Sequence, residues 1–262
     1  MRNHNNIVAI ASGKGGVGKT WLSVALARAL ADAGWRVLLF DGDLGLANID
    51  VQLGLDPRHD IADVLTGRAT PMEAVIRHGG GFDVLAGRSG NASLASLPPS
   101  TLATLATIPG LLANDYDIVL LDLAAGADAT MRTLVSIARA MLLVATGEPT
   151  SLTDAYAVLK RLARECPALE PGLVINMAGS QASGRATHAT LARAASHFLG
   201  RAPRLAGVIR RDPSVPASIR RQALAPASSP ACEDVAILVN AWFGAPEPQS
   251  CRRRKEIHLA SS

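Results

Sequence analysis

Short apolar runs alternate with longer amphipathic segments along most of the chain. Several of the runs are continuously apolar, which is typical of parallel strands that are covered on both faces. The segments between them suit crossover helices. We therefore predict an α/β fold, a doubly wound and mostly parallel sheet with helices on both faces. The predicted strands are 7–11, 36–40, 82–86, 117–121, 141–145, 173–176 and 205–209.

Local signals add boundaries to this pattern. Asp60 is a plausible N-cap for a short helix that runs through Leu65 and ends at Gly67. A helix over 233–243 has one apolar stripe, which indicates core packing. From residue 244 onward the chain is rich in Pro, Ser and Arg. We predict one domain over 1–243, followed by a flexible basic tail over 244–262.

A glycine-rich loop joins the first predicted strand to a helix predicted over 21–33. The loop matches GxxxxGK[ST], in which glycines let backbone N–H groups turn toward phosphates at a helix N-terminus. Lys19 would contact the β- and γ-phosphates, and the Thr20 hydroxyl would ligate Mg²⁺. The pattern and its flanks predict a nucleotide site. Its residues are Gly13, Lys14, Gly15, Gly16, Val17, Gly18, Lys19 and Thr20.

Aspartates follow two of the predicted strands. Asp41 and Asp43 come directly after the strand 36–40, and Asp122 follows the strand 117–121. Ligands of open α/β sheets bind at these carboxyl ends, and an aspartate there is a usual partner of Mg²⁺. Each aspartate could instead be a helix cap or a turn residue.

The loop and the aspartates carry a family resemblance. Lys14 is a second lysine within GKGGVGKT, the mark of the deviant Walker A ATPases of the MinD/ParA class. Residues 41–50 (DGDLGLANID) are similar to their second motif and first switch, and 122–126 (DLAAG) resemble their Walker B and second switch. The similarity extends over about 7–223. Within the class, 41–50 and 148–156 look most like the FlhG branch, also called FleN or YlxH, which regulates flagellar number and placement.

The resemblance implies a mechanism. Two ATP-loaded subunits would form a homodimer in which Lys14 of each reaches the phosphates of the other. Lys19 and Asp43 would take part in catalysis, Asp43 by orienting the attacking water. Asp41 and Asp122 would support Mg²⁺ beside Thr20.

The resemblance also implies two switches and a base contact. Segments 45–48 and 124–128 would sense the γ-phosphate. Asn176 matches the position that hydrogen-bonds adenine, although it could simply be a turn residue at the end of a strand. Arg210-Arg211-Asp212 matches a segment near the adenine, and a surface charge cluster explains it equally well.

Three features depart from the pattern. Trp21 stands where many relatives have Thr or Ser near the α-phosphate, so nucleotide affinity or choice could differ. Leu123-Ala124-Ala125-Gly126 lacks the Pro or Thr that relatives often have in the second switch. Few residues precede the first strand, whereas FlhG relatives often carry an extension that stimulates the GTPase FlhF, which puts that activity in doubt.

Composition limits the cellular locations and the binding partners that we expect for this chain. No apolar run is long enough to span a bilayer, so a cytoplasmic location is expected. Segment 252–256 contributes most of the net charge of +4, and aromatic residues make up only 3%, so nucleic acid is not an expected partner. The tail could give weak peripheral contact with the inner face of the cell membrane, or it could be a solvated basic segment. Cys166, Cys232 and Cys251 are isolated and show no disulfide or zinc pattern.

The expected function is an ATP-dependent dimerisation switch with slow, Mg²⁺-dependent ATP hydrolysis. In the FlhG-like interpretation it regulates flagella, with a flagellar regulator or an FlhF-type GTPase as partner. One alternative is a MinD-like ATPase that positions the division septum. A second is a ParA-like partitioning ATPase that associates with DNA.

Overall fold

One mixed sheet forms the centre of the computed structural model, which describes residues 6–45, 47–87, 97–126 and 128–246. Its strands run in the order β3-β4-β2-β5-β1-β6-β7-β8. The strand bounds are β1 Ile7–Ser12, β2 Val37–Gly42, β3 Val75–Arg77, β4 Asp83–Leu85, β5 Ile118–Ala125, β6 Ala140–Ala145, β7 Pro171–Ala178 and β8 Arg204–Arg210.

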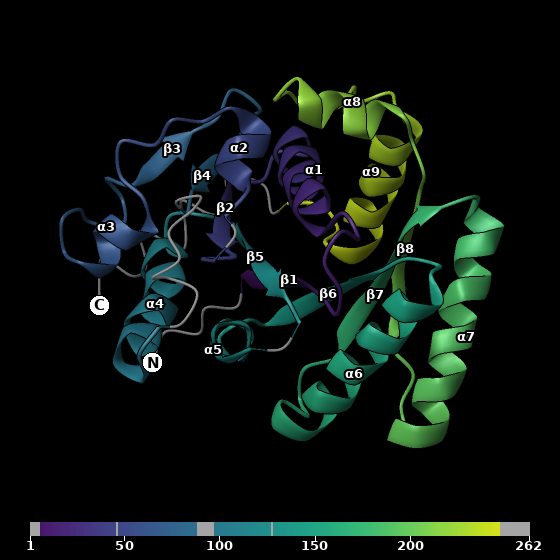
Figure 1. The fold of residues 1–262 in the computed structure, drawn as a ribbon. Helices are drawn as coiled ribbons and strands as arrows, with labels where there is room; N and C mark the ends of the chain where they lie inside the picture. Colours follow the sequence, from purple (N-terminus) through teal and green to yellow (C-terminus); the bar gives the residue numbers. More distant parts are fainter. Residues whose placement is uncertain (1–5, 46, 88–96, 127, 247–262) are drawn as a thin grey trace.

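Helices connect these strands and cover both faces of the sheet (Figure 1). Their bounds are α1 Lys19–Asp32, α2 Ile49–Leu53, α3 Ile61–Leu65, α4 Pro99–Leu112, α5 Ala129–Ser136, α6 Pro149–Glu165, α7 Gln181–Leu199, α8 Ser214–Arg220 and α9 Pro230–Trp242. The doubly wound α/β prediction is confirmed. No helix within the described ranges is both long and apolar enough to cross a membrane.

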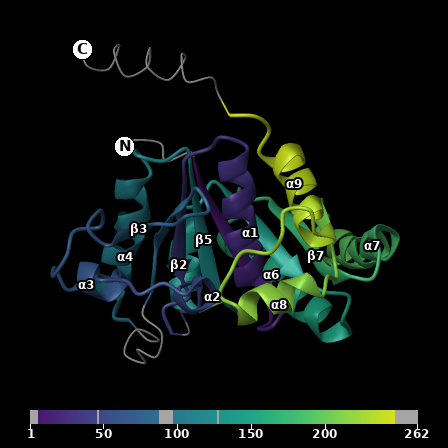
Figure 2. The same ribbon diagram turned by 90° about the horizontal axis from the view of Figure 1, so that it is seen from above.

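Alternating side chains of the central strands divide the interior into two cores. Val8 and Ile10 of β1 face a core that includes α1, α2 and α9, whereas Ile7 and Ala9 face a core shared with α3 to α7. A strand that is buried on both faces has no polar side to present, which explains its continuous apolar sequence. Figure 1 shows α1 and α9 above the sheet and α4 and α6 below it, and Figure 2 looks down on the side that carries α1.

The edge strand β3 was not predicted. It pairs antiparallel with β4, whereas the remaining strand pairs are parallel. Its three residues are half-buried or exposed, so they show no continuous apolar run. The glycines at 79–81 lie in the short turn that connects the two strands, and Gly81 has a φ of 85° there.

Two local predictions are confirmed. Asp60 caps α3 through a reciprocal capping box, in which the Asp63 N–H donates to Asp60 Oδ1 at 3.0 Å and the Asp60 N–H donates to Asp63 Oδ2 at 3.3 Å. The predicted helix over 233–243 is α9, which begins earlier, at Pro230. Its stripe packs into the core as expected, since Val235 is 0% exposed.

Candidate functional site

The glycine-rich loop lies between β1 and the N-terminus of α1, where backbone geometry creates an anion site. Gly16 and Gly18 have φ values of 79° and 81°, a region that other residues rarely adopt. Gly18 is the N-cap of α1, and no side chain of the described residues caps this helix end. The first N–H groups of the helix therefore point toward the loop, as phosphate binding requires.

Two loop glycines are also needed for close packing. A Cβ on Gly13 would overlap the backbone of Asp154 in α6, and a Cβ on Gly18 would overlap the amide of Asn176. Asn176 is 3% exposed, and its Nδ2 donates to the Val17 carbonyl at 2.8 Å. In this structure Asn176 therefore supports the loop. Its contact with adenine stays a prediction.

Two of the aspartates at the strand ends, Asp41 and Asp122, come together in the sheet. Asp41 of β2 and Asp122 of β5 are register partners on neighbouring strands and are 0% and 1% exposed. Lys19 Nζ lies 3.0 Å from Asp122 Oδ1, and Ser23 Oγ donates to the same oxygen at 2.9 Å. Asp122 Oδ2 is buried and has no hydrogen-bond partner in the described structure. This oxygen is available to a cation or to a metal-bound water.

Asp41 organises the segment that follows its strand, a role that sequence reasoning missed. Its carboxylate accepts hydrogen bonds from the N–H groups of Asp43, Asn48 and Ile49 at 3.2–3.3 Å. Burial raises the pKa of Asp41 well above its usual value, the nearby Asp122 raises it further, and the N–H groups of Ile49 and Asp43 oppose the rise. A cation beside this pair of carboxylates would relieve their repulsion.

Asp43 itself lines the cavity beside the loop. It is half-buried, and Asp41 holds its backbone. In the expected second switch, Asp128 caps α5 by accepting the Met131 N–H at 2.7 Å. Residues 46 and 127, which belong to the two expected switches, lie outside the described residues.

Lys14 is held by its own chain. Its Nζ lies 3.0 Å from Glu148 Oε2 and 2.8 Å from Thr150 Oγ1, at the start of α6. The pair is exposed, with 38% of the Lys14 side chain and 66% of the Glu148 side chain accessible. The segment 148–156 contributed to the sequence resemblance, but nothing in the sequence linked Glu148 to Lys14.

A cavity of about 850 Å³ opens above the loop, within the usual range for small-molecule sites. Its walls come from the loop, the segment after β2, α2, the end of β5 and the region around α8. Beyond the loop they include Asp43, Asn48, Val51, Gln52, Ala124, Ala125, Met177, Ile219, Arg220 and Gln222.

Trp21 lies at the boundary between this cavity and the core. It is 6% exposed and belongs to the apolar cluster around α1, while part of it lines the cavity. At position 21 the cavity is therefore lined by an apolar indole and not by the short hydroxyl side chain that the family resemblance leads one to expect.

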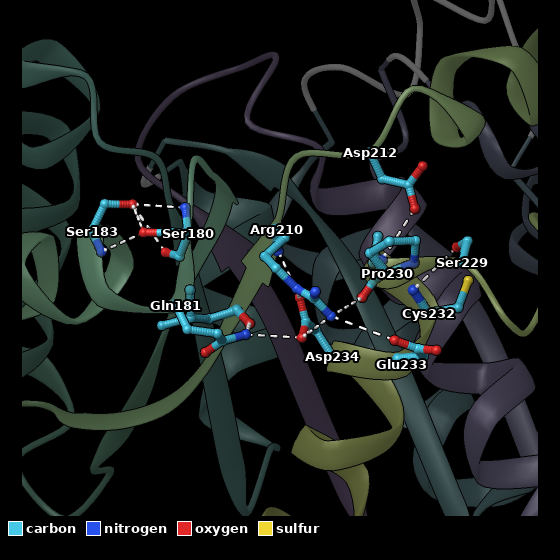
Figure 3. Close-up of polar contacts among 12 residues, drawn as sticks. Ser180, Gln181, Ser183, Arg210, Asp212, Ser229, Pro230, Cys232, Glu233 and Asp234 are labelled. Carbon is cyan, nitrogen blue, oxygen red and sulfur yellow. Dashed lines mark hydrogen bonds and ion pairs between the residues drawn. The ribbon is translucent and has the colours of Figure 1, made fainter.

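In the segment Arg210-Arg211-Asp212, Arg210 and Asp212 make polar contacts with neighbouring elements (Figure 3), whereas Arg211 is exposed. The Arg210 N–H and Nε both donate to Asp234 Oδ2 at 2.8 Å, and its Nη2 donates to Oδ1 at 3.0 Å. Asp234 is 3% exposed and also accepts from Gln181 Nε2 at 2.8 Å. The network joins β8, α9 and α7, so Arg210 has a structural role in this state.

The residues present suit Mg²⁺. No group of three or more His, Cys, Asp and Glu side chains in the described ranges could hold a metal by itself. Mg²⁺, however, usually takes one or two carboxylates together with waters and phosphate oxygens. Asp41, Asp122 and the Thr20 hydroxyl are consistent with that donor set. These features define a P-loop protein with the site of a Mg²⁺-dependent ATPase.

Comparison with known proteins identifies the family. Residues 8–225 match the CobQ/CobB/MinD/ParA nucleotide binding domain, and the chain belongs to this family. It is 41% identical over 216 residues to the antiactivator FleN of Pseudomonas aeruginosa, covering 82% of this chain and 77% of FleN. It is 32% identical over 208 residues to the flagellum site-determining protein YlxH of Helicobacter pylori, covering 76% and 70%.

A solved structure extends the likeness to the fold. The septum site-determining protein MinD of Pyrococcus horikoshii, complexed with Mg-ADP, superposes with a TM-score of 0.77 at 26% identity. The match covers 92% of this chain and 99% of the MinD chain. Fold, loop and family therefore agree on a nucleotide as ligand, with Mg²⁺ as its cofactor.

Proposed function

We propose that this chain is an ATP-dependent dimerisation switch whose slow hydrolysis of ATP regulates flagellar number or placement. The observation that carries the flagellar role is the 41% identity to FleN over most of both chains. The similarity to YlxH supports the same role. The loop and the two buried aspartates support ATP and Mg²⁺ as the ligands that work the switch.

Each site residue has a part in this proposal. Lys19 leaves Asp122 for the β- and γ-phosphates when ATP binds. Thr20, Asp41 and Asp122 hold the cation, which neutralises charge on the phosphates. Asp43 orients the attacking water.

Lys14 supplies the coupling to dimerisation. It leaves Glu148 and crosses to the phosphates of the second subunit. An added cation at the transferred phosphoryl group can raise the rate by about 10³–10⁵-fold, as arginine fingers do. Hydrolysis would then require the dimer.

Size-exclusion chromatography with light scattering tests the switch. With Mg²⁺ and a non-hydrolysable ATP analogue, the parent chain should become a dimer. Lys14→Ala should bind nucleotide and stay a monomer. Asp43→Ala should be trapped as a dimer by ATP itself. A parent chain that stays monomeric with the bound analogue would refute the proposal.

Positioning of the division septum is a second candidate. It is supported by the 35% identity to MinD of Thermotoga maritima over 59% of this chain, and by the MinD structures of similar fold. The structure of a MinC:MinD complex from Aquifex aeolicus, 26% identical to this chain with a TM-score of 0.77, illustrates a protein partner for that relative. Deleting the gene and counting flagella against minicells separates the two roles.

We place the protein in the cytoplasm, with weak contact between the tail and the inner face of the cell membrane. The tail residues 247–262 lie outside the described structure. Four cations in 252–255 could each contribute about 1 kcal/mol near an anionic leaflet. Sedimentation with anionic liposomes, with and without residues 252–262, tests the contact, and equal pelleting would refute it.

A further inference from the structure

Gln222 ends α8 in a conformation that usually needs glycine. Its N–H donates to the Ile219 carbonyl at 3.0 Å, and the Ala223 N–H donates to the Ser218 carbonyl at 3.1 Å. These two bonds form a Schellman motif, in which the residue at the position of Gln222 is left-handed. Its φ is 52°, so the chain uses a glutamine where glycine would be free of strain.

The side chain gives a reason for this choice. Gln222 Nε2 donates to the Val51 carbonyl in α2 at 3.1 Å. The same side chain lies over Gly54, where a Cβ would come within 3.2 Å of Gln222 Cβ. The amide therefore bridges α8 and the last turn of α2, two elements far apart in the sequence that lie side by side in Figures 1 and 2.

This bridge lies on the wall of the nucleotide cavity. Gln222 and Val51 both line the cavity, together with loop residues Gly15 to Thr20. Among the described residues, the other non-glycine residue with positive φ is Met177, at 54°, and it lines the same cavity. Strained residues persist where the surrounding structure requires them, and they cluster at ligand sites.

The bridge also connects with the metal-side carboxylate. The N–H groups of Asn48 and Ile49, at the N-terminus of α2, donate to Asp41 Oδ2 at 3.3 Å. The short helix α2 is therefore held at one end by Asp41 and at the other by Gln222. A displacement of α2 would open the cavity wall and loosen the segment after β2.

We propose that Gln222 is a positioning residue, a clasp between α8 and α2 that closes one wall of the nucleotide cavity and slows nucleotide release. The proposal depends on nucleotide binding in this cavity and not on dimerisation or on a flagellar role. Gln222 acts through α2, and its contribution is the hydrogen bond to Val51.

Two variants separate the clasp from the backbone strain. Gln222→Gly removes the side chain and relaxes the left-handed backbone. Gln222→Met keeps the length of the side chain and the strained backbone but has no N–H donor. Asn114→Ala is the matched control, because Asn114 also donates an amide hydrogen to a helix-end carbonyl, that of Leu111 at 3.3 Å, and does not line the cavity.

Stopped-flow release of fluorescent N-methylanthraniloyl-ADP with Mg²⁺ measures the effect. The hydrogen bond is exposed to solvent, so its loss predicts about twofold to fivefold faster release from both Gln222 variants, with Asn114→Ala unchanged. Gln222→Gly should also melt at the same temperature as the parent or higher, because its strain is relieved. If Gln222 only stabilised the fold, faster release would always come together with a lower melting temperature.

Release rates equal to the parent in both variants would overturn the proposal, as would faster release that appears only with a lower melting temperature. ADP is the probe because it tests the cavity without ATP-driven dimerisation. If the parent chain itself fails to bind ADP, nucleotide binding is at fault and not the clasp.

Discussion

At the scale of single residues, both lysines of the glycine-rich loop are already engaged within one chain. Lys19 is paired with buried Asp122, and Lys14 is paired with exposed Glu148. Both contacts must break for the proposed roles. The exposed one is easier to break, since ion pairs in solvent contribute only about 0–1 kcal/mol.

Weakening the Lys14 contact should favour the dimer. Glu148→Gln combined with Thr150→Val removes the charge and the hydroxyl that hold Lys14. We expect the dimer to form at about twofold to fivefold lower protein concentration with Mg²⁺ and the ATP analogue, as measured by analytical ultracentrifugation. Asp32→Asn, which breaks the exposed Arg28–Asp32 pair in α1, is the control. A weaker dimer in the double variant would contradict this prediction.

His78 should make stability depend on pH. Its Nδ1 accepts the Gly80 N–H at 3.0 Å, which requires the neutral ring. Burial lowers the pKa of His78, and Arg28 lowers it further. Between the lowered pKa and the usual value of about 6.5, His78 is more often protonated in the unfolded chain than in the folded one. Its contribution to the free energy of unfolding is therefore present above this pH window and is lost as the pH falls through it.

Urea unfolding at pH 5, 6 and 7 checks whether the free energy of unfolding rises with increasing pH, as expected. His78→Asn cannot titrate and should show a smaller rise than the parent. If the rise is the same in both proteins, another group causes it.

At the scale of elements, small residues decide how closely helices approach the sheet. Gly184 lies in α7, and a Cβ there would overlap Val208 of β8. Alanine favours a helix by about 1 kcal/mol over glycine, so helix propensity alone predicts that Gly184→Ala is stabilising. The overlap reverses this expectation.

We expect Gly184→Ala to lower the free energy of unfolding by about 1–3 kcal/mol in urea. Gly79→Ala is the control, because a Cβ there meets nothing within 4 Å. A Gly184→Ala protein as stable as the parent would mean that α7 can shift without loss.

The elements also differ in how well the sequence predicted them. Buried parallel strands such as β1 and β5 are predicted by their continuous apolar residues. The start of α3 is predicted by its capping aspartate. The strand β3 has only three residues and no buried side, so pairing with β4 makes it a strand. The apolar stripe did not predict where α9 begins, because the helix starts at Pro230, before the stripe.

At the scale of the whole molecule, nucleotide binding should stabilise the fold. A ligand at about 100 times its Kd adds roughly 2.7 kcal/mol to the free energy of unfolding. We expect Mg-ATP to raise the melting temperature of the parent in differential scanning fluorimetry and to leave that of Lys19→Ala unchanged.

Lys19→Ala also leaves Asp122 buried without its cation, so the variant itself should melt at a lower temperature than the parent. The informative quantity is therefore the shift on adding Mg-ATP and not the starting temperature. An undiminished shift in Lys19→Ala would show that this lysine does not contact the nucleotide.

The sequence by itself determined the class of fold, the phosphate loop and the strand-end aspartates, because backbone geometry and burial fix which residue types can occupy those positions. Only the tertiary structure decided which side chains meet. Glu148 lies 134 positions from Lys14, and Gln222 lies 171 positions from Val51. Such contacts leave no local pattern, since they depend on how the strands are ordered in the sheet. Packing alone brought α8 against α2 and so formed the wall of the nucleotide cavity that contains Gln222 and Val51.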